Sequence, residues 1–370
     1  MTGQQGSRIG HVETVTARAY RVPTESGPEA DGTLVWNATE FVVVEISGAG
    51  HTGLGYSYTS AGAARALIES RLADAILRED IFDLPRLWLR MNDALRNAGR
   101  PGLGSMAVSA LDQALWDLKS RVLQVPLALL LGRAQSCLPV YGSGGFVNSD
   151  DDTLCGQLRS WLNSGITAVK IKIGSGLSED VRRVALARQT IGGSVELMVD
   201  ANGAYDARGA LALMEHLQPF RVSWFEEPVS SDNLAALRWL RNRSPAGMAI
   251  AAGEYGWGSE YFHRMLAHEA VDVLQADATR CGVTGFLQAA TLCNAFSVPL
   301  SIHCAPAIQV SVGVAVPLLK HLEYFHDHVR IENLLFASGN RFDAGHLYPN
   351  IEVPGHGVSL IDEQADRYRI

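Results

Sequence analysis

The stretch "TAVKIKIGSGLSEDVRRVALARQTIGGSVELMVDANG", residues 167–203, decides the fold. A short apolar strand pattern opens it, an amphipathic helix pattern follows at 180–191, and a second strand pattern ends at Asp200. A strand, a helix and a second strand of this length, about 30 residues, form one βαβ unit. The same alternation continues in "VSWFEEP", "MAIAAGE", "DVLQADAT" and "VPLSIHC", each followed by a helical segment. The repeat predicts a parallel sheet of the kind found in α/β barrels.

The first third of the chain has a different pattern. Residues 40–59, "EFVVVEISGAGHTGLGYSYT", predict two strands joined by a Gly-rich turn, and apolar residues at helical spacing follow up to about residue 131. A barrel takes about 250 residues, so a chain of 370 has room for a second domain. We therefore expect an N-terminal domain of antiparallel strands and helices, followed by the barrel.

The composition argues against several classes of partner. A formal net charge of −8 gives no reason to expect binding to nucleic acid or to an anionic membrane. The five cysteines include no CxxC pair, which fits reduced thiols better than a disulfide framework. Residues 1–20 lack the apolar segment of a secretion signal, and no uninterrupted apolar run of about 18 residues occurs. We therefore expect a cytoplasmic protein without a membrane or nucleic-acid partner.

Charged side chains follow the predicted strands at regular intervals. Successive members of the set are 20 to 30 residues apart, close to one βα unit each: Lys170, Asp200, Glu226, Glu254, Asp277, His303 and Glu323. In a barrel the carboxyl ends of the strands form one rim, and active sites lie at that rim. The spacing therefore gathers these groups in one candidate site.

Three of these residues are carboxylates on consecutive strands, namely Asp200, Glu226 and Glu254. A single acid there could be a helix cap or part of a surface ion pair. Three converging carboxylates repel one another unless a cation neutralises them. Oxygen ligands suit a hard cation, so we predict Mg²⁺, with Mn²⁺ as the alternative. Strand alternation places Glu227 on the opposite face from Glu226, so we choose Glu226 as the ligand.

Two possible bases flank the predicted metal. Lys170 and Lys172 are two residues apart and share one face of their strand. A nearby metal and a second ammonium group lower the pKa of Lys172 toward that of a usable base, although lone lysines at strand ends commonly extend to solvent. His303 follows another strand, and Asp277 is placed to fix its tautomer and raise its basicity. Lys172 and His303 lie on opposite arcs of a closed barrel, so they would approach a substrate from two faces.

These motifs together resemble those of the enolase superfamily, specifically its mandelate racemase subgroup. The resemblance rests on "KIK" at 170–172, "DANG" at 200–203, "WFEEP" at 224–228, "GE" at 253–254 and "DATRCGVTG" at 277–285, with His303 and Glu323 after them. It implies an N-terminal α+β capping domain at 1–130, a modified (β/α)7β barrel at 131–340, and a C-terminal segment at 341–370 that returns to the capping domain. It also implies a homo-oligomer, from a dimer to an octamer.

The resemblance assigns a role to each candidate. Mg²⁺ holds the carboxylate of an α-hydroxy acid or sugar acid, a base removes the α-proton, and the metal stabilises the enediolate; use of a Lys or His base with Mg²⁺ is a known property of this superfamily. Lys172 then matches the base, Lys170 a contact to the substrate carboxylate, and the pair His303–Asp277 the second acid or base. Glu323 matches the acid that hydrogen-bonds a carboxylate oxygen of the substrate.

Specificity and reaction outcome are less well defined by the sequence. The resemblance implies that two loops of the N-terminal domain cover the substrate, here near 23–36 and 53–60. The first loop is rich in Gly, Pro and acids and has few obvious cations for a second carboxylate, so a monocarboxylate sugar acid is our hypothesis. Further candidates for substrate contact are Trp36, Tyr56, Tyr58 and, just past the first barrel strand, Ser143; the aromatic residues could equally pack between the domains.

We predict a dehydratase that yields a 2-keto-3-deoxy acid. A racemase or epimerase, a sugar-lactone cycloisomerase, and a non-catalytic sugar-acid binding protein are the alternatives. The motif "HDH" at 326–328 is interpreted as a solvated loop rather than as a second metal site.

Overall fold

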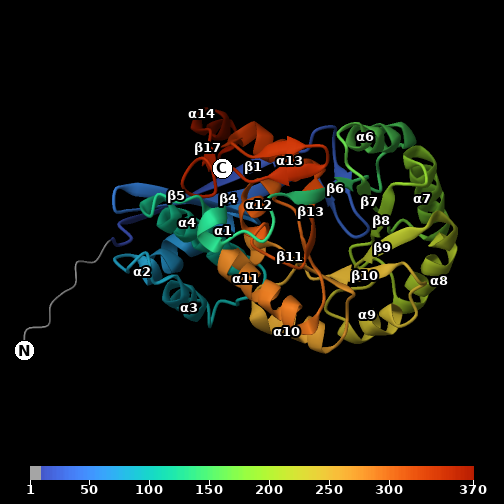
Figure 1. Cartoon of the computed structure of the whole chain (residues 1–370), viewed down its shortest axis with the longest axis horizontal. Coiled ribbons are helices and arrows are strands. Elements are labelled where there is room, and N and C mark those ends of the chain that lie inside the picture. The colour runs from blue at the N-terminus through green and yellow to red at the C-terminus, as the bar shows by residue number, and fades with distance from the viewer. Residues whose placement is uncertain (1–9) are drawn as a thin grey trace, which may run out of the picture.

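The computed structural model describes residues 10–370, which form an N-terminal domain and a barrel side by side (Figure 1). The N-terminal domain contains a three-stranded antiparallel sheet in the order β1-β4-β5. Its strands, with the small hairpin that precedes β4, are β1 (Thr14–Pro23), β2 (Glu29–Ala30), β3 (Val35–Trp36), β4 (Ala38–Gly48) and β5 (His51–Tyr58). The two predicted strands at 40–59 are thus β4 and β5.

A helical layer covers this sheet. Its members are α1 (Ala61–Leu67), a π-helical turn (Ile68–Leu72), α2 (Ala73–Ile76), α3 (Leu84–Ala94), α4 (Leu103–Val122) and α5 (Leu127–Leu131). Helix α4 lies directly on β5 because Gly53 and Gly55 have no side chain. A Cβ atom at Gly53 would lie 2.1 Å from the carbonyl oxygen of Ala114, and one at Gly55 would lie 2.2 Å from that of Ala110.

Eight parallel strands form the second domain and close into a barrel through the pairing of β13 with β6. They are β6 (Leu138–Gly144), β7 (Ala168–Lys172), β8 (Glu196–Asp200), β9 (Val222–Glu226), β10 (Ala249–Ala252), β11 (Val273–Ala276), β12 (Leu300–Ile302) and β13 (Leu319–Phe325). Seven helices connect them: α6 (Asp151–Asn163), α7 (Leu177–Ile191), α8 (Ala207–Leu217), α9 (Leu234–Arg241), α10 (Ser259–Ala267), α11 (Ala278–Phe296) and α12 (Pro306–Gly313). The predicted (β/α)7β barrel with a capping domain is confirmed.

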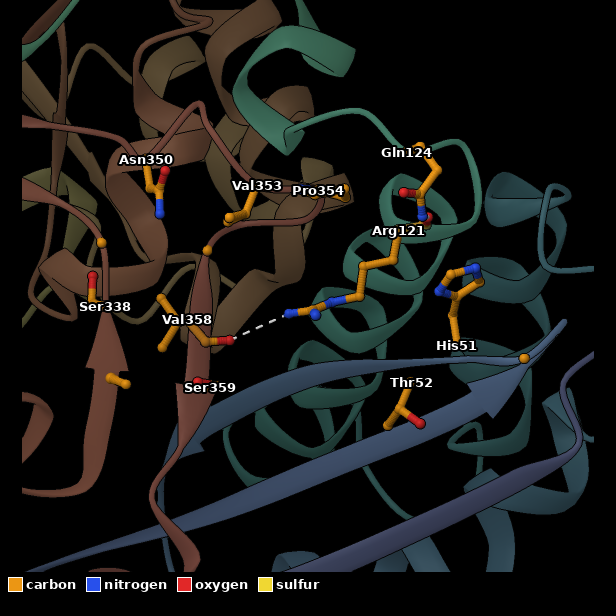
Figure 2. A pocket seen from close by; sticks show the side chains of 14 residues that line it. His51, Thr52, Arg121, Gln124, Ser338, Asn350, Val353, Pro354, Val358 and Ser359 are labelled. Atoms are coloured by element: carbon orange, nitrogen blue, oxygen red, sulfur yellow. Dashed lines mark hydrogen bonds between the residues drawn. The ribbon is translucent and has the colours of Figure 1, made fainter.

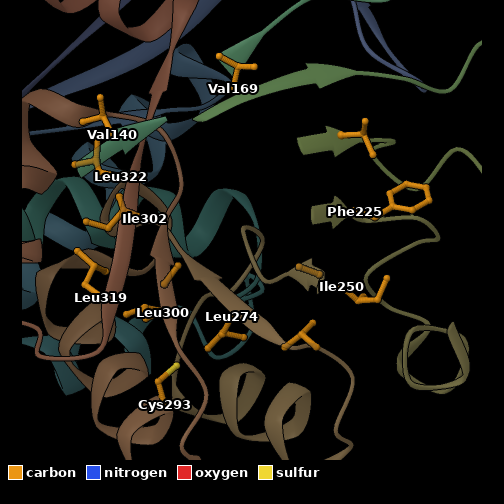
Figure 3. Close-up of a cluster of buried hydrophobic side chains, with 14 of the residues drawn as sticks. Val140, Val169, Phe225, Ile250, Leu274, Cys293, Leu300, Ile302, Leu319 and Leu322 are labelled. Carbon is orange, nitrogen blue, oxygen red and sulfur yellow. The ribbon is translucent and has the colours of Figure 1, made fainter. Parts of the chain in front are cut away.

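Strand alternation separates an apolar outer face from an inner face that carries the site. Side chains such as Val169, Phe225 and Ile250 belong to the large buried cluster between strands and helices (Figure 3). The next residues along the same strands point into the barrel. At the amino-terminal level these inner residues form a separate buried cluster, which includes Tyr141, Met198, Trp224 and Val273. These side chains, with the buried His321 that contacts Tyr141 and Trp224, fill the barrel interior below the rim.

The carboxyl-terminal part of the chain runs back to the N-terminal domain. Its elements are α13 (His326–Leu335), β14 (Phe336–Ser338), β15 (Arg341–Asp343), β16 (His346–Tyr348), β17 (Val358–Leu360) and α14 (Asp362–Ala365). The backbone N–H of Ile370 donates to the carbonyl of Ala19 in β1 at 2.9 Å, and the chain end lies beside β1 in Figure 1. The boundaries at residues 130 and 340 stay a prediction.

The interpretation of residues 326–328 as a solvated loop is wrong. His326 begins helix α13, and both Asp327 and His328 are buried. The imidazole ring of His328 stacks on Tyr58 with 3.5 Å between ring centroids, while Asp327 accepts hydrogen bonds from Thr39 and Arg330. The polar motif is therefore a contact between the capping domain and the barrel, which sequence polarity alone does not indicate.

A buried carboxyl group, Asp112 of α4, joins the two domains. It accepts hydrogen bonds from the backbone N–H and the hydroxyl of Thr284 in α11, at 2.9 and 2.7 Å. Burial raises the pKa of Asp112 to about 7, although the Thr284 bonds oppose that change. Because the folded protein then holds a proton that the unfolded chain releases near pH 4, stability falls as pH rises between these two values.

Replacement of Asp112 by asparagine should remove this pH dependence. From pH 4 to pH 7 the wild type should lose up to about 1.4 kcal/mol of unfolding free energy per pH unit relative to the Asp112→Asn variant. Denaturant unfolding of both proteins at a series of pH values measures the difference. A difference that stays constant across this range would contradict the assigned direction of the pKa shift.

Candidate active site

Three carboxylates converge at the rim of the barrel. Asp200 and Glu226 are the last residues of β8 and β9, where they stand opposite each other in the strand register. Glu254 lies two residues beyond the end of β10. One oxygen atom from each group lies within 4.8 Å of those of the other two, and all three side chains are buried. The regular spacing of strand ends in the sequence therefore becomes proximity in space.

This carboxylate set fits a hard divalent cation. Glu226 Oε1 and Glu254 Oε2 are buried without a hydrogen-bond partner in the described part of the chain. Burial raises the pKa of Glu226 to about 8, and repulsion from Asp200 adds to this effect. A cation among the three groups would satisfy the unpartnered oxygens and offset the like charge. Oxygen-only ligands match the preference of Mg²⁺.

Strand alternation predicted that the side chain of Glu227 lies on the opposite face from that of Glu226, and this prediction is wrong. Strand β9 ends at Glu226, and Glu227 has a φ of 36°, so the extended geometry stops between them. The Glu227 side chain is buried, and its pKa is raised by burial and then by the charge of Glu254. The WFEEP motif thus brings a fourth carboxyl group near the other three. Sequence reasoning failed here because alternation holds only within a regular strand.

Both lysines of β7 point into the barrel and meet these acids. Lys170 Nζ lies 2.7 Å from Glu226 Oε2 and 2.8 Å from Glu323 Oε1. Lys172 Nζ lies 2.5 Å from Asp200 Oδ2 and 3.0 Å from Asn202 Oδ1.

The pKa of Lys172 is raised in this arrangement. Burial is the largest single effect and lowers it, but the charges of Asp200, Glu226 and Glu254 together outweigh burial, so the net direction is upward. The lowering predicted from the sequence depends on a bound cation beside the ammonium group, which would also compete with Lys172 for Asp200.

His303 and Asp277 form a hydrogen-bonded pair across the barrel from β7. His303 Nδ1 lies 2.9 Å from Asp277 Oδ2, and Asp277 also accepts bonds from Thr279 and from the Gln309 amide. The other ring nitrogen, Nε2, lies 3.3 Å from Glu254 Oε2. Burial lowers the pKa of His303, but Glu254 and the bond to Asp277 outweigh it and raise the value to about 9. The ring can therefore hold a proton at neutral pH.

Glu323 links the lysine side of the site to the histidine side. Its Oε1 atom accepts from Lys170 and from the hydroxyl of Ser143 at 2.6 Å, and its Oε2 atom accepts the backbone N–H of Cys304 at 3.1 Å. Ser143 lies within β6, rather than just past it, because the strand extends to Gly144. Its hydroxyl is already bonded to Glu323, so it positions that carboxylate in this structure.

The aromatic candidates from the capping domain take different positions. Tyr56 is fully buried, and its hydroxyl donates to Glu332 of α13 at 2.6 Å. Tyr58 stacks on His328. Both rings therefore pack between the domains, which was the alternative to lining the pocket. Trp36 donates to Glu29 at 3.1 Å and meets Phe146 edge to face, at the rim beside β6.

A cavity of about 690 Å³ lies next to the carboxylates, between the capping domain and the rim loops. Its lining includes Thr33 and Met106 from the capping domain and Asn202, Glu227 and Arg280 from the barrel. Sequence reasoning missed Asn202 and Arg280 as site residues. The signal was available, because both lie within the quoted motifs "DANG" and "DATRCGVTG".

Arg280 is closely paired in this cavity. Its guanidinium lies 3.6 Å from Glu254 Oε1 and 3.8 Å from Asp277 Oδ2, and it covers the ring of Tyr255. It therefore connects the carboxylate set to the His303–Asp277 pair, and its charge is largely balanced by these two acids.

A larger pocket of about 830 Å³ lies away from the rim, between the β4–β5 turn and the C-terminal segment (Figure 2). The charged side chain in Figure 2, Arg121, donates to the carbonyl of Val358 at 3.5 Å and to Asp117 at 2.7 Å. None of the acids, lysines or histidine described above lines it. We therefore place the candidate site at the rim of the barrel.

Two family models match the chain. Residues 14–132 match the model of the mandelate racemase / muconate lactonizing enzyme N-terminal domain. Residues 154–365 match the enolase C-terminal domain-like model. Within residues 10–370, no helix combines the length and the apolar character required to cross a membrane.

Full-length relatives include characterised enzymes and solved structures. A 3,6-anhydro-alpha-L-galactonate cycloisomerase of Streptomyces coelicolor is 32% identical, with 97% of this chain and 99% of the relative covered. The structure of a mandelate racemase/muconate lactonizing enzyme-like protein from Rubrobacter xylanophilus is 47% identical over 97% and 100% of the two chains, with a TM-score of 0.94. The structure of an L-talarate/galactarate dehydratase from Salmonella typhimurium, liganded with Mg and L-lyxarohydroxamate, is 26% identical over 100% and 96%, with a TM-score of 0.91.

Proposed function

Because this chain belongs to the enolase superfamily, as an enzyme of its mandelate racemase subgroup, we propose that it removes the α-proton of a sugar acid and then expels the oxygen at the β-carbon. With a free β-hydroxyl, water leaves and the product is a 2-keto-3-deoxy acid. The observation that supports this best is the placement of two separate proton-transfer groups, Lys172 and His303, on two sides of one carboxylate set.

Asp200, Glu226 and Glu254 would hold Mg²⁺, which the Salmonella relative also contains. When bound there, Mg²⁺ supplies positive charge beside the substrate carboxylate and stabilises the negative charge that develops when the α-proton leaves. Lys170 and Glu323 would orient the same carboxylate from the other side, since they are paired at 2.8 Å and both face the barrel axis. Glu323 needs a proton to donate to a substrate oxygen. Burial favours that proton, but the charges of Lys170 and His303 lower the pKa of Glu323, so the substrate would first have to draw Lys170 away from it.

Lys172 would take the α-proton. Its ammonium group must first release a proton, and separation from Asp200, its 2.5 Å partner, favours that release. Asn202, which accepts from Lys172 at 3.0 Å, keeps the amine directed toward the rim. Because the lysine amine is buried, little water competes with substrate for its lone pair.

His303 would act as the acid in the second step. The hydrogen bond to Asp277 raises the pKa of His303 and favours the protonated ring, and Asp277 fixes Nδ1 so that Nε2 carries the transferable proton. Transfer of this proton to the β-oxygen makes it a neutral leaving group, while the electron pair of the enediolate forms the new carbon–carbon double bond. Tautomerisation of the resulting enol then gives the 2-keto acid.

A cycloisomerase is the second candidate, and the full-length Streptomyces relative favours it. If the β-oxygen belongs to a ring, the same elimination opens the ring, and the oxygen stays in the product as a hydroxyl group. A racemase would instead use His303 to return a proton to the α-carbon. The residues present support all three outcomes, so the substrate decides among them.

We further propose a substrate with one carboxylate. Arg280, a cation of the adjacent cavity, is balanced by Glu254 and Asp277, and Glu227 and Asp232 add negative charge to the lining. A second carboxylate would have to compete with these acids for Arg280 or use the exposed Arg264. Hydroxyl groups are uncharged, so the acids that line the cavity do not repel them.

The test is a screen of sugar acids and their anhydro and lactone forms with the Mg²⁺-loaded enzyme, read by 2-keto acid formation and by deuterium uptake at the α-carbon. Keto product from an acyclic acid supports dehydration, and keto product from an anhydro acid supports the cycloisomerase. Deuterium uptake alone supports a racemase. If no compound in the collection gave keto acid or deuterium uptake, the proposal would be contradicted and a non-catalytic sugar-acid binding protein would be favoured.

Replacement of His303 by asparagine should separate the two steps. The variant should form keto acid about 10²–10⁴-fold more slowly, because the leaving group loses its acid, yet still exchange the α-proton in D₂O. The His216→Asn variant, on the exposed side of α8, is the matched control. Equal loss of exchange and elimination would show that His303 is required for proton removal itself.

Two further predictions concern the whole protein. A cytoplasmic location is proposed from the unpaired state of the five cysteines, which fits a reducing compartment. Assembly into a homo-oligomer is proposed from family resemblance, and size-exclusion chromatography with light scattering measures it directly.

A further inference from the structure

A second cluster of metal-binding side chains lies beside the carboxylate set. His303 Nε2, Cys304 Sγ and Glu323 Oε2 converge at the ends of β12 and β13. The sulfur lies 3.3 Å from the imidazole nitrogen and 3.5 Å from the carboxylate oxygen, and these last two atoms are 3.8 Å apart. All three side chains are buried. The proposed reaction uses His303 and Glu323 but leaves Cys304 without a role.

The spacing of these atoms matches a tetrahedral zinc site. Zinc binds sulfur at about 2.3 Å and nitrogen or oxygen at about 2.0–2.2 Å, so tetrahedral ligands are about 3.3–3.6 Å apart. Two of the observed separations, 3.3 and 3.5 Å, fall in this range, and the third, 3.8 Å, exceeds it slightly. Small side-chain rotations would bring all three into coordination without moving the strands.

One further carboxylate oxygen lies beside the imidazole of this cluster. Glu254 Oε2 lies 3.3 Å from His303 Nε2, and it is buried with no hydrogen-bond partner in the described residues. An unpartnered carboxylate oxygen in a buried position is costly, and positive charge on either side of it, in the carboxylate set or at this cluster, would offset that cost.

The chemistry of the cluster differs from that of the neighbouring carboxylates. A thiolate and an imidazole are ligands for a borderline or soft cation, whereas three carboxylates suit Mg²⁺. The positive φ of Cys304, 53°, with that of Ala305, 41°, turns the backbone directly after His303 and directs the thiol back toward the imidazole. Glu254 lies between the two sets, because it belongs to the carboxylate set and its Oε2 atom lies 3.3 Å from His303 Nε2.

We propose that His303, Cys304 and Glu323 form a second, zinc-binding site, and that zinc bound there shuts off the enzyme by occupying the His303 nitrogen that faces the substrate. Binding displaces the thiol proton of Cys304 and the Nε2 proton of His303 to solvent. The three ligand residues include none of Asp200, Glu226 and Glu254, which stay available to Mg²⁺. The inhibition rests on the proposed function, because it assumes that His303 acts as the acid. The binding itself does not.

The binding is tested with Co²⁺, a zinc analogue that reports thiolate ligation through a near-ultraviolet charge-transfer band. The full chain is held in excess Mg²⁺ and titrated with Co²⁺, and zinc is then added to displace it. The wild type and Cys155→Ala, which removes another buried thiol on α6, should both show the band and lose it to zinc. Cys304→Ala and Cys304→Ser should not show it, and their affinity for zinc should fall by at least about tenfold.

Activity gives the second readout. Zinc should inhibit the wild type at saturating Mg²⁺, and inhibition of Cys304→Ala should require at least about tenfold more zinc. Absence of the band in the wild type, or its persistence in both Cys304 variants, would overturn the site. A Cys304-dependent band on a protein without turnover would keep the site and contradict the proposed function. Turnover without the band would support the proposed function and contradict the zinc site.

Discussion

Replacing Lys172 by methionine is expected to lower kcat for keto-acid formation by about 10²–10⁴-fold. Methionine has a similar length but no amine, so the α-proton loses its acceptor while the packing inside the barrel changes little. Mg²⁺ should bind at least as tightly as in the wild type, because the ammonium group that lies 2.5 Å from Asp200 is gone. Steady-state assays of keto acid and a Mg²⁺ titration followed by calorimetry measure both effects.

The matched control for this variant is Lys320→Met. Lys320 lies on β13 at the end of the barrel opposite the rim. Its side chain is exposed, and its Nζ atom lies 3.5 Å from Glu196 Oε1. It should keep wild-type turnover. If Lys172→Met lost turnover only because it no longer bound Mg²⁺, Lys172 would be a structural partner of Asp200, and the role of base would pass to another residue.

Replacing Glu226 by glutamine is expected to abolish Mg²⁺ binding and, with it, turnover. The substitution removes one of three carboxylate charges and leaves a neutral amide where a carboxylate oxygen lay 2.7 Å from Lys170 Nζ. At Mg²⁺ concentrations about 100 times the dissociation constant, the wild type should gain about 2.7 kcal/mol of stability from binding. The variant should gain almost none.

Thermal unfolding with and without Mg²⁺ measures this difference independently of activity. Glu196→Gln, at the other end of the neighbouring strand β8, should keep the full Mg²⁺-dependent rise in Tm. An equal rise in Glu226→Gln would contradict the assignment of the metal to this carboxylate set.

The architecture was predictable from the sequence because the barrel repeats one unit. Lys172, Asp200 and Glu226 stand at the same level on three adjacent strands, and their spacing in the chain reflects one βα unit per step. Any set of groups tied to strand ends by such a repeat must meet at one rim. The His303–Asp277 pair follows from the same rule, since β11 and β12 are neighbours.

The errors lie where the backbone leaves a regular strand or where two domains meet. Glu227 follows the last residue of β9, so its position depends on a local φ of 36° that no periodicity encodes. Asp327 and His328 are polar residues whose local sequence pattern does not indicate burial. Their burial is created by the contact between the capping domain and α13, and long-range contacts of this kind cannot be inferred from spacing along the chain.

The contact of Cys304 with the site could not be predicted from the sequence pattern either. Its neighbour His303 is on the inner face, so alternation would direct the next side chain outward. The positive φ of Cys304 reverses that direction and places the sulfur 3.3 Å from the imidazole. Backbone conformations of this type are the part of the site that sequence pattern describes least well.

The division of labour between Lys172 and His303 is tested most directly by one proton NMR experiment in D₂O, with the same substrate and saturating Mg²⁺ in every sample. Wild type, Lys172→Met and His303→Asn are compared for loss of the α-proton signal and for appearance of keto acid. We expect both events in the wild type, loss of the α-proton without keto acid in His303→Asn, and neither in Lys172→Met. Loss of the α-proton at the wild-type rate in Lys172→Met would contradict the assignment of Lys172 as the base.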